Sequence, residues 1–183
     1  MKKQETLRYT GKRLAIFCLV IAALSTTAFP QTNSAPGQSP LTVILVRHAE
    51  KAVVLPENKD PDLSATGLAR AEEISKMFGD AGVATIYATQ FKRTQQTAKP
   101  LAEKLGLPIT QVEAKKTSDL VKQIRSQSAG QVIFIAGHNN TVPEIIAALG
   151  GPKLPIIPET EYDNLYILTV LSDGSAKLLK LKY

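Results

Sequence analysis

The sequence is poor in residues that build disulfides, thiol-based sites and metal sites. Its 183 residues include one cysteine (Cys18), two histidines and no tryptophan. No cysteine follows Cys18, so the rest of the chain can form neither a disulfide nor a catalytic thiol. Two histidines without HxxxH or HExxH spacing offer too few ligands for a usual zinc site. The Walker glycine loop and the Gly-x-Ser-x-Gly elbow are also absent.

The excess of basic over acidic residues is concentrated at the N-terminal end of the chain. The whole sequence has 22 basic and 16 acidic residues, but residues 1–28 hold five of the basic and one of the acidic ones. The remainder has a net charge of only +2. A nucleic-acid binder would be expected to carry a concentrated basic stripe, so the near-neutral body argues against this class, and any attraction to anions must be local.

The first forty residues have the composition of an export segment and a linker. Lysines and arginines precede an apolar run at 14–24, and small residues follow it. This pattern predicts a signal peptide over 1–28 and a periplasmic or extracellular protein. The run is shorter than the roughly 20 residues of a membrane span, although an uncleaved membrane anchor is the alternative. Residues 29–40 are rich in Pro, Ser and Gly, which predicts a flexible linker before a single domain at 41–183.

Strand-like and helix-like segments alternate along this domain. Unbroken apolar runs are typical of strands buried on both faces, and helices show apolar residues at helical spacing. Strands are predicted at 42–46, 83–88, 108–112 and 131–136, helices at 64–78, 91–105, 119–126 and 141–149, and a hairpin at 164–171 and 175–183. This order predicts a three-layer α/β/α domain with a mixed, mostly parallel sheet and a C-terminal β-hairpin.

Local signals add detail to this outline. Ser64 is predicted to cap its helix, with Leu63 and Leu68 as a hydrophobic staple. Arg70 is expected on the exposed face of that helix. Three tyrosines near the end of the chain are interpreted as sheet packing: Tyr162, Tyr166 and Tyr183.

Four basic side chains follow the predicted strands. Arg47 and His48 come directly after 42–46, His138 follows 131–136, and Arg93 lies in the first helical turn after 83–88. Open α/β sheets bind their ligands at the carboxyl ends of such strands. Guanidinium groups and the helix N-terminus near Asn139 suit a phosphate. The alternative is that each histidine only caps its strand.

Histidine can itself act as a nucleophile. We therefore predict in-line attack by His48 on a phosphoryl group whose oxygens are held by the surrounding charges. His48 is expected to be neutral and His138 protonated.

Several motifs resemble one family. Arg47-His48-Ala49-Glu50 resembles the Arg-His-Gly/Ala signature of the histidine phosphatase superfamily, also called phosphoglycerate mutase-like. Three further stretches match that family in order, and together they cover nearly the whole chain from Thr42: 63–71 (LSATGLARA), 92–98 (KRTQQTA) and 137–141 (GHNNT). The resemblance implies the phosphoglycerate mutase-like fold, with His48 as the phosphorylated nucleophile. It also implies that Arg47, Arg93, His138 and the Asn139 amide hold the phosphoryl oxygens, with no metal or organic cofactor.

The sequence departs from the family pattern in two places. The insertion that supplies a glutamate proton donor after the third strand is short here, and Glu113 is the only nearby acid. Glu113 is thus either a candidate acid or a solvent-exposed loop carboxylate. The asparagine that mutases carry after the first histidine is missing from 51–56. Both losses favour the small phosphatases of the family, including those acting on phosphohistidine, over a phosphoglycerate mutase-type phosphotransferase.

The expected function is that of an exported, cofactor-independent phosphatase of the histidine acid type, a phosphoric monoester hydrolase. Its partner would be a small phosphorylated substrate or a phosphoprotein, without nucleic acid, and with membrane contact only through an uncleaved N-terminal segment. Loops 51–62 and 152–163 are expected to form the walls that determine specificity. Two alternatives stay open: a non-catalytic protein that binds a phosphorylated ligand, and a metal-dependent hydrolase. The oligomeric state is not predicted.

Overall fold

The structure is a computed structural model that describes residues 39–53, 57–127 and 130–183. The predicted signal peptide at 1–28 and residues 29–38 of the predicted linker lie outside these ranges. Export and the domain limits therefore stay predictions. Within the described ranges, every helix is too short or too polar to span a bilayer.

Strands and helices follow one another in the predicted order. The described elements are β1 (Leu41–Arg47), α1 (Ala65–Phe78), β2 (Val83–Thr89), α2 (Lys92–Leu105), β3 (Ile109–Val112), α3 (Thr117–Arg125), β4 (Val132–Gly137), α4 (Thr141–Ala148), β5 (Asn164–Val170) and β6 (Ala176–Lys182). The strands form one sheet in the order β3-β2-β4-β1-β5-β6. The first four of these are parallel, and β5 and β6 form an antiparallel hairpin beside β1. The predicted mixed, mostly parallel sheet with a C-terminal hairpin is confirmed.

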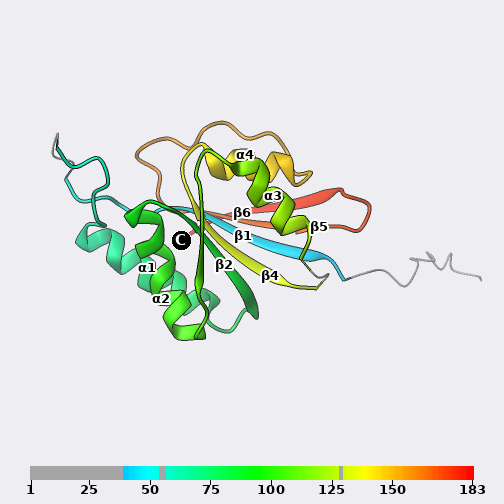
Figure 1. Ribbon diagram of the computed structural model, residues 1–183, viewed down its shortest axis with the longest axis horizontal. Helices are drawn as coiled ribbons and strands as arrows, with labels where there is room; N and C mark the ends of the chain where they lie inside the picture. The colour runs from blue at the N-terminus through cyan, green and yellow to red at the C-terminus, as the bar shows by residue number, and fades with distance from the viewer. Residues whose placement is uncertain (1–38, 54–56, 128–129) are drawn as a thin grey trace, which may run out of the picture. The chain divides into compact units, whose positions relative to one another are not determined.

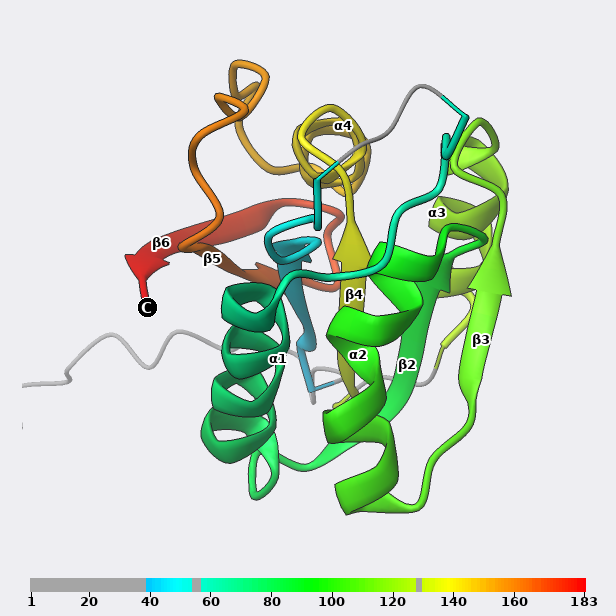
Figure 2. The same cartoon turned by 90° about the vertical axis from the view of Figure 1, so that its left-hand side faces the viewer.

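Helices cover both faces of the sheet. Helices α1 and α2 lie on one face, and α3 and α4 lie on the other (Figures 1 and 2). Successive side chains of a strand point to opposite faces, so an unbroken apolar strand supplies two cores. Strand β1 does so: Val43 and Leu45 pack with α3 and α4, while Ile44 and Val46 pack with α1 and α2. The three-layer arrangement is confirmed.

The start of α1 fits its predicted cap but not its predicted staple. The Ser64 hydroxyl accepts a hydrogen bond from the Gly67 amide at 3.1 Å, as expected of an N-cap. Leu63 is buried with Ala49 and Ala71, whereas Leu68 is half exposed. The staple prediction is wrong because the buried face of α1 runs through Gly67 and Ala71, and Leu68 lies beside it.

The prediction that Arg70 lies on a solvated helix face is also wrong. Its guanidinium donates to both carboxylate oxygens of Glu50, with Nη2 2.7 Å from Oε1 and Nε 2.9 Å from Oε2. Its Nη1 donates to the backbone oxygen of Tyr183 at 3.2 Å. Arg70 therefore links the loop after β1 to the chain beyond β6, a contact between segments that are distant in sequence.

Candidate active site

The two histidines lie side by side at the carboxyl edge of the sheet. Strands β1 and β4 are parallel neighbours, and their register pairs Arg47 with Gly137. The following residues, His48 and His138, are consequently adjacent, and the His48 amide donates to the Gly137 carbonyl at 2.8 Å. The imidazole centroids are 5.4 Å apart with an interplanar angle of 67°. The structure thus brings together two residues separated by ninety positions.

The surroundings of His48 determine which ring nitrogen can react. Nδ1 lies 2.8 Å from the backbone carbonyl oxygen of Ala49. A carbonyl only accepts hydrogen bonds, so we assign the proton to Nδ1, which leaves the lone pair of a neutral ring on Nε2. Burial lowers the pKa of His48 to about 3, and the positive fields of His138, Arg93 and Arg47 act in the same direction. His48 is therefore neutral at pH 7 and has the state required of a nucleophile.

His138 is held from two sides. Its Nε2 lies 2.8 Å from the hydroxyl of Thr89, at the end of β2. Its amide donates to the hydroxyl of Thr141, in the first turn of α4, at 2.8 Å. Burial and the fields of the nearby cations lower the pKa of His138 to about 4. This direction is opposite to the protonated state expected from the sequence, because the ring is buried among positive charges.

Arg93 reaches the same place from the first turn of α2. Its guanidinium carbon lies 4.4 Å from the centroid of the Phe91 ring. Nη1 is 3.4 Å from a carboxylate oxygen of Asp60. Within the described residues, the buried Nε of Arg93 has no hydrogen-bond partner. One donor of this guanidinium is thus left for another group.

Arg47 is the most enclosed charge of the site, with 1% of its surface exposed. Its Nη1 donates to the carbonyl oxygens of Pro158 at 2.7 Å and Glu161 at 3.1 Å, and its Nη2 donates to Glu159 at 2.6 Å. The ring of Tyr162 lies 4.2 Å from the guanidinium carbon. The buried Nε has no partner among the described residues. Arg47 therefore fastens the 152–163 loop and still keeps a free donor.

Helix α2 holds the loops that surround the site. The Thr97 hydroxyl accepts from the Ala49 amide at 2.9 Å, and the Gln96 side chain accepts from the Leu63 amide at 2.7 Å. The Gln95 amide group donates to the Thr89 carbonyl at 2.6 Å. The stretch RTQQTA thus fixes the backbone at Ala49, directly after His48, at Leu63, and at Thr89, whose hydroxyl contacts His138.

A cavity of about 290 Å³ opens at this edge of the sheet. It is lined by His48, Lys51, Gln90, Phe91, Arg93, Ala114, Lys115, His138, Asn139, Asn140, Thr141 and Glu159. Arg47, which is buried, is not one of the lining residues. Glu113 is exposed and is not one of the lining residues, although its neighbour Ala114 is. The structure therefore brings together every predicted site residue except Glu113, and the catalytic roles assigned to them stay predictions.

Sequence reasoning missed three contributors to the site. Glu159 and Asp60 pair with the two arginines, and both lie in segments expected only to form specificity walls. Tyr162 was expected to pack on the sheet, but its ring lies over Arg47 and 6.1 Å from the His48 ring. Tyr166 is in the core as predicted. No pattern in the 152–163 segment signals which of its residues meets Arg47.

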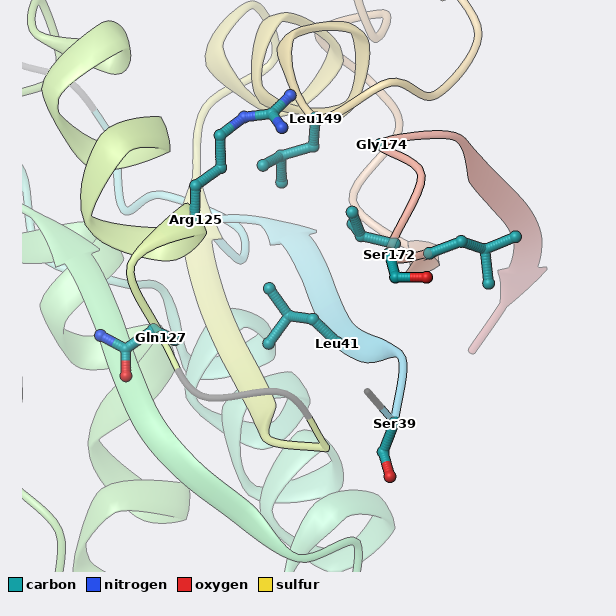
Figure 3. A pocket seen from close by; sticks show the side chains of 9 residues that line it. Ser39, Leu41, Arg125, Gln127, Leu149, Ser172 and Gly174 are labelled. Carbon is teal, nitrogen blue, oxygen red and sulfur yellow. The ribbon is translucent and has the colours of Figure 1, made fainter. Parts of the chain in front are cut away.

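A second cavity lies at the other end of β1 and carries no comparable chemistry. It measures about 190 Å³ and is lined by Ser39, Leu41, Arg125, Gln127, Leu149, Val170, Leu171, Ser172 and Gly174 (Figure 3). Arg125 is the single charged group among these described residues, and it donates to the Ala148 carbonyl at 2.9 Å. Elsewhere in the described ranges, we find no group of three histidine, cysteine, aspartate or glutamate residues close enough to hold a metal ion.

Comparison with known proteins agrees with this geometry. Residues 43–116 match the sequence model of the Histidine phosphatase superfamily (branch 1). No curated protein matches the chain.

Solved structures share the fold. A protein assigned as the phosphohistidine phosphatase SixA of Agrobacterium tumefaciens is 24% identical, with a TM-score of 0.61 over 78% of this chain and 97% of that one. A mycobacterial glucosyl-3-phosphoglycerate phosphatase is 13% identical, with a TM-score of 0.61 over 78% and 97%. An Escherichia coli protein assigned as an alpha-ribazole-5'-P phosphatase is 13% identical, with a TM-score of 0.62 over 78% and 96%.

The fold and the site define an α/β protein with paired histidines in an arginine-lined pocket. Residues 43–116 match the histidine phosphatase superfamily, and the domain shares the fold of solved phosphatases, so the family resemblance that the sequence motifs predicted is confirmed. The matched residues include Arg47, His48 and Arg93, and the second histidine is supplied by the same fold beyond them.

Proposed function

We propose that the domain is a phosphatase of the histidine acid type that hydrolyses a phosphomonoester or a phosphohistidine through phospho-His48. The observation that carries the proposal is the position of His48. Its Nδ1 faces the Ala49 carbonyl, which leaves Nε2 to react, and Arg47 and Arg93 each keep an N–H group without a partner among the described residues. A nucleophile adjacent to permanently charged donors suits phosphoryl transfer, in which positioning and charge stabilisation supply most of the catalysis.

The reaction would proceed in two halves. Nε2 of His48 attacks phosphorus, and the bond between phosphorus and the leaving oxygen or nitrogen breaks. The free Nε–H groups of Arg47 and Arg93 bind the phosphoryl oxygens as charge builds on them. Water then attacks phospho-His48, and orthophosphate leaves. None of these steps needs a metal or an organic cofactor.

The size of the cavity supports a small substrate or a single phosphorylated side chain. About 290 Å³ is at the lower end of ligand pockets. Proteins of this fold are described as acting on phosphohistidine and on glucosyl-3-phosphoglycerate, which are compatible with these two substrate classes. We also propose that the chain is exported through its N-terminal segment, which is either cleaved or retained as an anchor. Mass spectrometry of the secreted or membrane-bound chain would distinguish these two forms.

A non-catalytic phosphate binder is the second candidate. The position of Glu113 favours it, because the acid expected from the sequence is exposed and does not line the cavity. In that case, the chain would bind phosphorylated ligands with micromolar affinity and release no phosphate.

A substrate panel tests the proposal. The panel includes aryl and alkyl phosphates and a phosphohistidine peptide, each with the unsubstituted chain, His48→Ala and the surface control Lys76→Ala. His48→Ala should lose at least about a thousandfold in kcat/KM, because it removes the nucleophile itself. Lys76→Ala should keep full activity, since Lys76 is exposed and its one ion pair among the described residues is the exposed one with Glu73. Retained hydrolysis by His48→Ala would refute the mechanism, and binding without turnover would favour the second candidate.

A further inference from the structure

Among the described residues that line the cavity, Glu159 carries the one carboxylate. Among the described lining residues, all other charged side chains are basic. Glu159 comes from the loop after α4, whereas the acid expected from the sequence, Glu113, follows β3. The site therefore contains an acidic group, but it comes from a different segment of the fold.

The two carboxylate oxygens of Glu159 are fixed by the residues next to the histidines in the sequence, Arg47 before His48 and Asn139 after His138. Oε2 accepts from Arg47 Nη2 at 2.6 Å, and Oε1 accepts from Asn139 Nδ2 at 2.8 Å. The partner groups are themselves held, Arg47 by two loop carbonyls and Asn139 at the start of the turn into α4. The Glu159 side chain nevertheless stays 67% exposed. A positioned carboxylate thus remains open to water in the cavity that both histidines line.

These contacts determine what Glu159 can do with a proton. Each oxygen already accepts a hydrogen bond from a donor, one of them a guanidinium. A carboxylate that accepts at both oxygens offers no proton to a leaving group, but it can take a proton from water.

We propose that Glu159 is the general base of the second half-reaction, a step that rests on the proposed function. The oxygen of a water molecule attacks the phosphorus of phospho-His48 while one of its protons passes to the Glu159 carboxylate. The P–Nε2 bond breaks, and its electron pair returns to Nε2. The products are orthophosphate and neutral His48, and Glu159 then releases the proton to solvent.

This assignment restricts the substrate. The first half-reaction receives no proton from Glu159, so it favours leaving groups that need little protonation. Phosphohistidine and aryl phosphates meet this condition, whereas an alkyl alkoxide is a much poorer leaving group. Aryl phosphate and phosphohistidine should therefore be turned over much faster than an alkyl phosphate.

Rapid-quench kinetics with p-nitrophenyl phosphate separate the two half-reactions. In Glu159→Gln, the nitrophenol burst should persist at close to one equivalent, because attack by His48 does not use this carboxylate. The steady-state rate should fall by about 10²- to 10⁴-fold, the usual contribution of a general base, and phosphoenzyme should accumulate. Formate should restore part of the steady-state rate in Glu159→Ala, an effect that a purely structural role would not produce.

Two matched variants complete the experiment. Glu72→Gln alters an exposed carboxylate of α1 that does not line the cavity, so its burst and steady state should be unchanged. Glu113→Gln should likewise resemble the unsubstituted chain. Slow dephosphorylation in Glu113→Gln, with normal dephosphorylation in Glu159→Gln, would transfer the role to Glu113 and overturn the proposal.

Two other results would also overturn it. Faster turnover by Glu159→Gln would show that the carboxylate only competes with phosphate for Arg47. A burst and a steady-state rate that fall together, without rescue by formate, would show that Glu159 merely holds Arg47 in place. The absence of any phosphoenzyme in the unsubstituted chain and in Glu159→Gln would instead refute the proposed function.

Discussion

Burial governs the chemistry of the two histidines. Both rings are almost fully covered, and both lie close to guanidinium groups that oppose a further positive charge. Removing an imidazolium from water and placing it beside cations disfavours protonation. The site therefore holds two neutral imidazoles at pH 7, and the fixed charges come from the arginines.

The low pKa values of the two histidines can be measured directly, since the chain has no others. With pKa values lowered to about 3 for His48 and about 4 for His138, the NMR signals of both imidazole rings should stay constant from pH 8 to pH 5. A titration midpoint near 6.5 for either ring would contradict this expectation. In an Arg93→Gln variant, the pKa of His138 should rise, because a positive field is removed.

The same shifts make folding stability depend on pH. Below pH 6.5 the unfolded chain takes up protons on both histidines while the folded chain does not, so the free energy of unfolding falls as pH falls toward 4. Urea titrations at several pH values should show this loss. The histidine contribution should disappear in a His48→Asn, His138→Asn double variant that folds. An equal pH dependence of stability in the unsubstituted chain and the double variant would refute the assignment of this loss to the histidines.

Helix α1 approaches the loop after β1 too closely for any side chain at Gly67. A Cβ at this position would overlap the carbonyl oxygen of Glu50, whose backbone belongs to the signature loop of the site. The same carbonyl accepts the Ser64 amide at 2.9 Å. The glycine therefore fixes the distance between α1 and the residues that follow His48.

A matched pair of glycine substitutions tests this contact. Gly67→Ala should lower the free energy of unfolding by about 1–3 kcal/mol, because the added methyl group meets rigid backbone. Gly79→Ala, at the other end of α1, meets only the flexible end of the Lys104 side chain and has a helical φ of −61°. It should be neutral or stabilising by about 0.4–1 kcal/mol. Equal effects in urea denaturation would rule out the steric explanation.

Across the whole molecule, Arg70 joins the active-site loop to Tyr183, directly after the last strand of the sheet. Burial alone would raise the pKa of Glu50, but the hydrogen bonds from Arg70 hold it below its usual value. The side chains of Arg70 and Glu50 are each only about one-fifth exposed. Removing one partner of a largely buried ion pair leaves the other charge uncompensated, which lowers the free energy of unfolding.

Arg70→Gln should therefore lower the free energy of unfolding at pH 7 by about 1–3 kcal/mol, since Glu50 loses a charged donor. Lys76→Ala on the same helix removes only an exposed pair and should change stability by less than about 0.5 kcal/mol. The difference between Arg70→Gln and the unsubstituted chain should shrink in acid as Glu50 becomes protonated. A difference that is independent of pH would contradict the ion-pair explanation.

The sequence was sufficient to predict the layers of the fold and the position of the histidines. Both follow from local patterns: an apolar run predicts a buried strand, and a residue just after such a strand lies at the ligand-binding edge. His48, His138 and Arg93 were found in this way. The helix predicted at 91–105 ends as expected, at Gly106, which has a φ of 64°.

The contacts that the sequence did not predict all depend on tertiary proximity. Arg70 has the spacing of an exposed helical residue, and only the folded chain brings Glu50 and Tyr183 beside it. Glu159 and Tyr162 lie in an irregular segment without periodicity, so nothing local indicates which of them meets Arg47. Loop residues of this kind can be assigned only once the positions of their partners are known.

The covalent intermediate on His48 tests the central claim most directly. The full chain would be mixed with a ³²P-labelled aryl phosphate, quenched within milliseconds and digested, and the labelled peptide sequenced by mass spectrometry. We predict one acid-labile, base-stable phosphate on His48, which is lost in His48→Ala and chased from the unsubstituted chain by unlabelled substrate. Rapid substrate hydrolysis with no label on His48, or with label on another residue, would contradict the account.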